Sequence, residues 1–201
     1  MILLTETQYN PPVAFFWHAI RSESIQIEAH ENYIKQSYRN RCHVLTAQGV
    51  QPLSIPVRHG NSKIKTPVTE IEIDYSQKWQ LVHWRTIQAA YGRAPYFEFY
   101  SDYIKAIYER QPKYLFELNV ELLKLYLKLL KLSRPLNFTE VYQTEAPANV
   151  LDLRNRIHPK IYPDNLHVKP YTQVFGKQFA PELSIIDLLF TQGPASLSYL
   201  Q

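Results

Sequence analysis

The 201-residue sequence predicts an α/β (or α+β) fold with a mixed sheet, and three observations lead to that prediction. Near the N-terminus a strand, a helix and a second strand follow one another, which is the order of a βαβ unit. Two extended runs around a glycine-containing connection then predict an antiparallel hairpin. A mid-chain helical block follows over residues 79–132. The length suits a single domain over residues 1–201.

The predicted βαβ unit opens with a strand over residues 2–7, which tandem prolines separate from a helix over residues 13–22. Pro12 suits the position that begins a helix. The second strand, residues 24–30, alternates apolar and hydrogen-bonding side chains, so one of its faces is apolar and the other is polar. A crossover of this kind pairs the two strands in parallel.

The arms of the predicted hairpin are residues 42–47 and residues 53–57. Pro52 and Pro56 lack the amide hydrogen that a central strand donates, so they confine the second arm to a sheet edge or a bulge. Residues 68–75 alternate as a further strand, and the middle of the chain therefore adds antiparallel pairing to the sheet.

Three helices make up the helical block. The first begins near Trp79 and ends at Gly92, and Pro95 opens the second. The third helix, residues 115–131, carries its acids early and its lysines late, which complements the helix dipole. Leucines fill most of its other positions and indicate burial. Residues 136–143 then return to a strand.

Residues 145–165 contain three prolines and predict a long surface loop with at most one turn of helix. Loops of this length in compact domains usually have a function or are mobile. A last helix is predicted over residues 184–190, and Asp187 in its first turn either caps this helix or anchors Tyr171 or Gln173.

The most polar stretch of the chain, residues 28–42, directly follows the second predicted strand. In open α/β sheets, ligands usually bind at the carboxyl ends of parallel strands. The loop that holds Gln8 and Tyr9 leaves the neighbouring strand, so we expect it to converge with residues 32–41.

Lys35, Arg39 and Arg41 form a cationic group beside two tyrosines. Guanidinium and ammonium groups of this kind match phosphate or carboxylate oxygens, although a buried carboxylate such as Glu28 is an equally good structural partner. Trp84 adds either a stacking wall or simply core packing. The predicted substrate-binding residues are Gln8, Tyr9, Asn32, Tyr33, Lys35, Tyr38, Arg39, Asn40, Arg41, Trp84 and Arg85.

Glu28 and His30 share the polar face of the second predicted strand and are the candidate catalytic acid and base. The same pair with His43 lacks tight metal-ligand spacing, so a metal is not expected. Cys42 is a nucleophile only if a base activates it, and inert core is the alternative. The five scattered glycines form neither a dinucleotide-binding nor a P-loop pattern, which leaves any cofactor unknown.

Composition restricts the classes of partner. A net charge of +4 is low for a nucleic-acid-binding protein, although basic and aromatic residues are the groups that bind RNA. Residues 114–132 contain too many charged side chains for a membrane span. One cysteine and the absence of a signal-peptide pattern favour a cytoplasmic location.

Several phrases resemble the WbqC-like protein family. They are YNPP at 9–12, HENYIKQSYRNR at 30–41, LSIPV at 53–57, HWRTI at 83–87, YGRAPYF at 91–97 and LSIIDLLF at 183–190. Many members open with a His-Gln-Pro-x-Tyr-x-Pro-Trp-like phrase. Here Thr5-Glu6-Thr7 precedes Gln8 and Val13 replaces the tryptophan, so no role of that histidine is carried over.

The resemblance extends over residues 3–200 and implies a cytoplasmic bacterial protein linked to O-antigen or other surface-polysaccharide biosynthesis. The function it favours is transfer of a small group to a nucleotide-activated amino sugar, or another modification of that sugar. The alternative is a non-catalytic protein that binds a phosphate- or carboxylate-bearing ligand. Either function makes a small anion, such as a nucleotide sugar, the expected partner.

Overall fold

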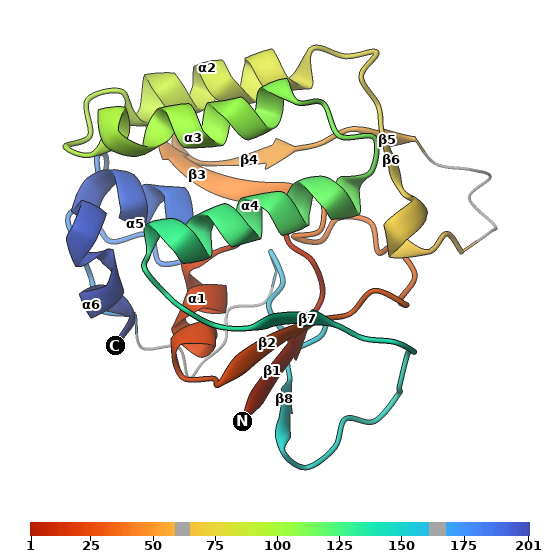
Figure 1. Cartoon of the computed structure of the whole chain (residues 1–201). Coiled ribbons are helices and arrows are strands. Elements are labelled where there is room, and N and C mark those ends of the chain that lie inside the picture. Colours follow the sequence, from red (N-terminus) through yellow and green to blue (C-terminus); the bar gives the residue numbers. More distant parts are fainter. Residues whose placement is uncertain (59–64, 161–167) are drawn as a thin grey trace.

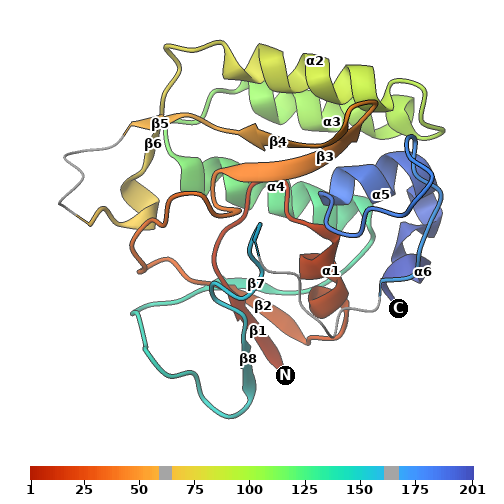
Figure 2. The same cartoon turned by 180° about the vertical axis from the view of Figure 1, so that it is seen from behind.

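The computed structural model describes residues 1–58, 65–160 and 168–201, and its helices lie on one side of a four-stranded parallel sheet (Figure 1). The view from behind shows the same separation (Figure 2). The strand order is β7-β2-β1-β8. These strands are β1 (Ile2–Thr5), β2 (Ser24–Ile27), β7 (Leu136–Phe138) and β8 (Val150–Asp152). The predicted α/β class is therefore confirmed.

The N-terminal βαβ unit forms as predicted. Helix α1 (Val13–Ile20) connects β1 to β2, which pair in parallel with Leu3 opposite Ile25. Both side chains are fully buried, as is Phe16 of α1, because the apolar face of the sheet packs against this helix in the hydrophobic core. Strand β2 ends at Ile27, three residues earlier than the alternation of side chains predicts.

The loop prediction for residues 145–165 is wrong where β8 forms. Val150–Asp152 pairs in parallel with β1, and Ile2 lies opposite Val150. Three residues are too few to show a strand pattern, and their partner strand lies at the other end of the chain. From β1 the chain adds β2 and β7 on one side and β8 on the other, so the strand order reverses between β1 and β8. Open α/β sheets usually bind ligands at such a point. Residues 161–165 of that predicted loop lie outside the described residues.

Antiparallel pairing occurs in two separate two-stranded sheets. The predicted hairpin is β3 (Arg41–Thr46) and β4 (Gly49–Ser54), and Gly49 takes a positive φ of 100° at its turn. The strand predicted over residues 68–75 is reduced to β6 (Glu72–Ile73), because a 3-10 helix (Val68–Glu70) precedes it. Its partner is β5 (Val57–Arg58).

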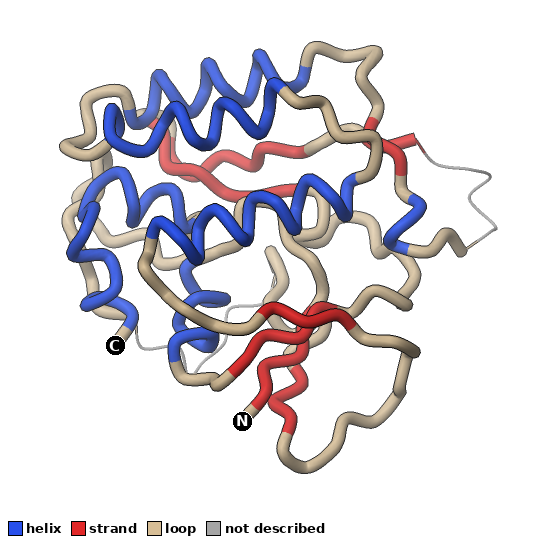
Figure 3. The backbone as a smooth tube through the Cα atoms, viewed as in Figure 1, coloured by secondary structure: helices blue, strands red, loops and turns tan. Residues whose placement is uncertain are grey.

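The helical block begins at Trp79 as predicted and ends at Leu129, three residues before the predicted end. It consists of α2 (Trp79–Tyr91), α3 (Phe97–Glu109) and α4 (Leu115–Leu129). Helices α2 and α3 form an outer layer, and the β3–β4 hairpin lies between this layer and α4 (Figure 3). Among the described residues, no helix is long and apolar enough to cross a membrane.

The C-terminal segment folds into α5 (Ile185–Gln192), a 3-10 turn (Gly193–Ala195) and α6 (Ser196–Leu200). Ser184 caps α5 by accepting a hydrogen bond from the Ile186 amide. The Asp187 carboxylate is fully buried and accepts hydrogen bonds from Tyr171 at 2.7 Å and Gln173 at 3.2 Å. The prediction that Asp187 anchors Tyr171 or Gln173 is confirmed, and the structure shows that it binds both.

Candidate functional site

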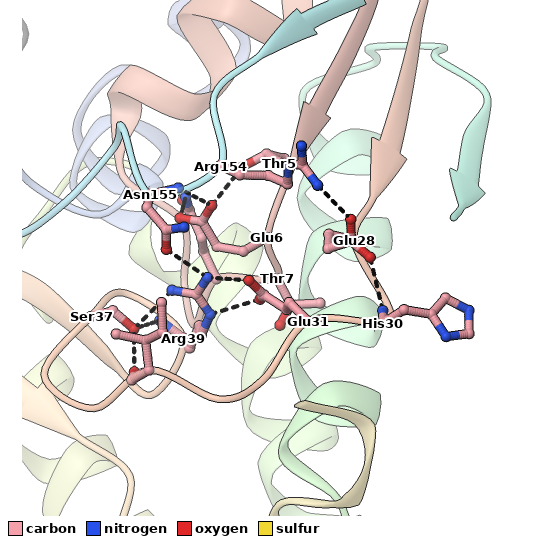
Figure 4. A network of polar contacts seen from close by, with 12 residues as sticks. Thr5, Glu6, Thr7, Glu28, His30, Glu31, Ser37, Arg39, Arg154 and Asn155 are labelled. Atoms are coloured by element: carbon pink, nitrogen blue, oxygen red, sulfur yellow. Dashed lines mark hydrogen bonds and ion pairs between the residues drawn. The ribbon is translucent and has the colours of Figure 1, made fainter. Parts of the chain in front are cut away.

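Buried ion pairs hold together the carboxyl ends of the parallel strands (Figure 4). Glu28, the first residue after β2, is fully buried and accepts a hydrogen bond from Thr139 at 2.7 Å and another from the His30 amide at 2.9 Å. Its second oxygen lies 2.9 Å from Arg154 Nη1. Arg154 follows β8 and also donates to Asp152. Both oxygens of Glu28 therefore have partners inside the protein.

Arg39 forms the second part of this arrangement. Its guanidinium is fully buried and makes a two-point contact with the carboxylate of Glu31, with Nε 2.7 Å from Oε1. It also donates to Ser37 at 3.2 Å and to the Asn155 side chain at 2.9 Å. Because these partners occupy its donors, the Arg39 guanidinium holds the 31–39 loop in place. Arg39 therefore has the structural role that the sequence leaves open as the alternative to anion binding.

Glu6 connects the two ion pairs to β1. Its carboxylate accepts hydrogen bonds from the Asn155 amide at 2.9 Å and from Gln8 Nε2 at 3.1 Å. We call the set of Glu6, Glu28, Glu31, Arg39, Asp152, Arg154 and Asn155 the charged network. The sequence interpretation missed five of these seven residues as site components: Glu6, Glu31, Asp152, Arg154 and Asn155. Glu31 belongs to the polar stretch of residues 28–42, which is a usable signal, whereas Glu6 fell inside the first predicted strand. The other three belong to β8 or follow it.

A cavity of about 580 Å³ lies beside the charged network. The loops that leave the carboxyl ends of β2, β7 and β8 all contribute to its wall. It is lined by His30, Glu31, Asn32, Tyr33, Ile34, Lys65, Tyr142 and Asn155. We call it the edge cavity. Three of the predicted site residues, His30, Asn32 and Tyr33, line it.

Backbone pairing holds one wall of the edge cavity in place. The Tyr33 amide donates to the Thr66 carbonyl at 2.9 Å, and the Val68 amide donates to the Glu31 carbonyl at 3.0 Å. This pairing places Lys65 beside the 31–33 segment. Burial raises the pKa of Tyr33 to about 12, so its hydroxyl keeps its proton at neutral pH.

The two candidate catalytic residues do not face the same space. Because β2 ends at Ile27, His30 no longer shares the strand face of Glu28. The His30 imidazole is exposed and points away from Glu28 (Figure 4). Glu28 lines a different cavity, on the open face of the sheet.

The Gln8–Tyr9 loop converges with residues 32–41 as expected, but as packed core. The Tyr9 amide donates to the Tyr38 carbonyl at 2.8 Å, and Asn119 bridges Thr7 and the Arg39 carbonyl. The Tyr9 hydroxyl lies 2.8 Å from His83 Nδ1 and 2.6 Å from the Tyr108 hydroxyl. We call Tyr9, Asn10, His83, Tyr108 and Tyr126 the tyrosine network.

The other residues of the predicted loop have diverse surroundings. Lys35 is exposed, and Arg41 is half-buried on β3. Tyr38 is buried, with its ring edge-on to that of His43 at 5.7 Å between centroids. Asn40 donates to the Ile55 carbonyl at 2.9 Å, which ties the loop to the end of the hairpin.

Trp84 and Arg85 lie on α2, away from the edge cavity. The Trp84 ring packs against Phe97 of α3 at 6.2 Å between centroids, and it lines a separate cavity of about 420 Å³ between α2 and α3. Arg85 is exposed. The structure therefore does not bring this pair to the polar loop, because the helical layer lies beyond the hairpin.

Cys42 belongs to the core. It is 1% exposed, burial raises its pKa to about 12, and the Asn10 amide group is its hydrogen-bond partner at 3.6 Å. A thiol in this state is a poor nucleophile, which favours the inert reading of this residue. In the described ranges, no group of three or more histidine, cysteine or acidic side chains is arranged to hold a metal ion.

The fold and this site define a class of protein: an α/β protein whose parallel sheet opens onto a polar cavity at its carboxyl edge. The chain belongs to the WbqC-like protein family, whose sequence profile matches residues 7–166. It is also similar to the uncharacterised protein Rv1507c of Mycobacterium tuberculosis, with 26% identity over 228 aligned positions that cover 100% of this chain and 97% of that protein. No solved structure matches the chain.

Proposed function

We propose that this protein binds a small phosphate- or carboxylate-bearing ligand, of the nucleotide-sugar class, in the edge cavity. One observation carries the proposal: the loops after three strands of the parallel sheet, β2, β7 and β8, line a single cavity of about 580 Å³. Ligands of open α/β proteins usually bind beyond the carboxyl ends of the strands. Such pockets carry a small number of polar groups that orient the ligand.

The charges around the edge cavity favour an anion. Lys65 lines it and supplies an ammonium group, and Lys35 follows the lining residue Ile34 in the chain. Glu31 also lines it, but the buried contact with Arg39 balances its negative charge. In this proposal Lys65 takes over the anion-binding role that the sequence pattern suggests for Arg39.

The other residues that line the edge cavity suit a sugar ring or a nucleobase. Tyr33 and Tyr142 offer aromatic surfaces on which a ring can stack, and Asn32 and Asn155 offer amide groups for its hydroxyls. A nucleotide sugar combines these two features with a diphosphate, which makes it the ligand class to test first. A cytoplasmic location, favoured by the single cysteine, fits this ligand.

The second candidate function is transfer of a small group to such an amino sugar in surface-polysaccharide biosynthesis. The observation that favours it is the His30 imidazole, which lines the edge cavity and has no hydrogen-bond partner among the described residues. An imidazole placed in this way can accept a proton from the attacking group. Glu28 is then a positioning residue, because its carboxylate accepts a hydrogen bond from the His30 amide.

Calorimetric titration with UDP-N-acetylglucosamine tests the binding proposal. We expect Lys65→Ala to weaken binding about tenfold, the loss of one charge-assisted hydrogen bond. Lys124→Ala is the matched control, since Lys124 is an exposed lysine on α4 and does not line the edge cavity. A folded wild-type protein that binds no nucleotide sugar, or equal affinities in both variants, contradicts the proposal. His30→Gln should abolish turnover while binding persists if the second function holds.

A further inference from the structure

The parallel sheet has an open face. The helices cover the face that carries Leu3 and Ile25, and in the part of the chain that the structure describes none of them reaches the opposite face (Figures 1 and 2). All-parallel sheets usually have helices on both faces. Here the second face carries Gln26 and Glu28, the hydrogen-bonding side of β2, and the loop of residues 139–149 spans it.

A cavity of about 390 Å³ lies between this face and the loop, and we call it the face cavity. Its lining residues are Ile2, Leu4, Gln26, Glu28, Phe138, Thr139, Glu140, Val141, Gln143, Ala146, Pro147, Asn149, Val150 and Arg154. It shares no lining residue with the edge cavity. Successive residues face different spaces: Arg154 lines the face cavity, whereas Asn155 lines the edge cavity.

The charges of the face cavity are opposite to those of the edge cavity. Arg154 is 6% exposed at its side chain, and its three guanidinium nitrogens already donate to Glu28 and Asp152. The Tyr142 ring covers the guanidinium at 5.0 Å. Arg154 is therefore not available to an anionic ligand, and two carboxylates more than balance its charge.

Glu140 adds a further carboxylate to the wall, and this one is exposed. Gln26, Gln143 and Asn149 line the same space and offer amide oxygens and amide hydrogens. Leu4, Phe138 and Val150 contribute apolar surface beside these groups. Such a combination provides an acceptor for a cation, partners for hydroxyls and contact for a carbon skeleton.

We propose that the face cavity is a second ligand site, and that it takes a small hydroxylated primary amine. The ammonium pairs with the Glu140 carboxylate, and the amide groups of Gln26 and Gln143 bind the hydroxyls. The Glu28–Arg154 ion pair forms the rigid end of the site, because both side chains are almost completely buried and are hydrogen-bonded to each other. This site is independent of ligand binding in the edge cavity.

Three sugars that share the same ring but differ in charge test the assignment: glucosamine is cationic, glucose is neutral and glucuronate is anionic. Amide chemical shifts of the full-length protein at pH 6.5 report binding at the lining residues. We expect glucosamine to bind about tenfold more tightly than glucose, the contribution of one charge-assisted hydrogen bond, and glucuronate to bind more weakly than either.

Glu140→Gln should remove the preference for glucosamine. Glu145→Gln is the matched control, because Glu145 is an exposed acid in the same loop that does not line the face cavity. Lys65→Ala should leave glucosamine binding unchanged, which separates this site from the edge cavity. Equal affinities for glucosamine and glucose, equal effects of the two glutamate changes, or no shifts with any of the sugars would overturn the assignment.

Discussion

Two networks of mostly buried polar side chains meet at the loop after β1, and they differ in how their polar groups are paired. The charged network joins carboxylates to guanidinium groups at the edge of the parallel sheet, beside two cavities. The tyrosine network is formed by hydroxyl, amide and imidazole groups that lie among the helices. Each of its five residues is at most 3% exposed.

The two networks differ in what a single change leaves behind. Removing a hydroxyl from the tyrosine network leaves a neutral partner without a hydrogen bond, which costs about 1–3 kcal/mol. Removing a cation from the charged network leaves a carboxylate in a site with little water, which costs more. A single change in the charged network should therefore destabilise the loops after the parallel strands more than a single change in the tyrosine network destabilises the helical layer.

The largest effect is expected from Arg39→Met, which leaves the buried Glu31 carboxylate without its cation. We expect the free energy of unfolding to fall by about 3–5 kcal/mol, measured by urea denaturation. The double change Arg39→Met with Glu31→Leu should recover most of that loss, because apolar groups of similar volume tolerate burial. A single change that costs less than about 1 kcal/mol would place the ion pair among the weak surface pairs.

The tyrosine network predicts a pH dependence. Burial lowers the pKa of His83 to about 4, so the folded protein keeps this imidazole neutral where the unfolded chain, with a pKa of 6.5, binds a proton. As the pH falls below 6.5, the imidazole of the unfolded state takes up a proton before that of the folded state. The free energy of unfolding therefore decreases as the pH decreases. The loss approaches roughly 3 kcal/mol at pH 4, from 1.36 kcal/mol for each pKa unit.

The comparison with His83→Asn isolates this effect, since the Asn oxygen can still accept a hydrogen bond from Tyr9. Burial raises the pKa of Glu182 to about 7, and that group changes stability in the opposite direction over the same pH range. The measured quantity is therefore the difference in unfolding free energy between wild type and variant at pH 7 and pH 4. A difference that does not shrink on acidification argues against a neutral buried imidazole.

The sequence predicts the parts of this molecule that repeat a pattern over many residues. Helices α2, α3 and α4 are 13 to 15 residues long, and their apolar periodicity shows them clearly. The βαβ unit and the hairpin are local in the chain and have turn signals at proline and glycine. Strand β8 has three residues and pairs with β1 across the whole domain, so no local pattern indicates it.

The site is predicted only in part, for the same physical reason. The polar stretch after β2 indicates where a cavity forms, and His30, Asn32 and Tyr33 line it. Which cation in that stretch is buried depends on contacts such as the one between Arg39 and Asn155, which are 116 positions apart. Arg39 pairs with Glu31 because both side chains are buried together. The sequence shows which residue types are present, but it does not show which of them are buried.

The smallest effect is expected from Lys105→Ala on the surface of α3. Lys105 lies 3.8 Å from Glu109, one helical turn away, and the two side chains are 47% and 67% exposed. Water solvates both charges, so the loss in unfolding free energy should be below about 0.5 kcal/mol, and salt should reduce it further. Both variants remove one cation from an ion pair, but only Arg39 is buried. Measuring them under the same conditions therefore shows whether charge or burial causes the large effect. If Lys105→Ala costs as much as Arg39→Met, the contrast between buried and exposed ion pairs does not hold in this protein.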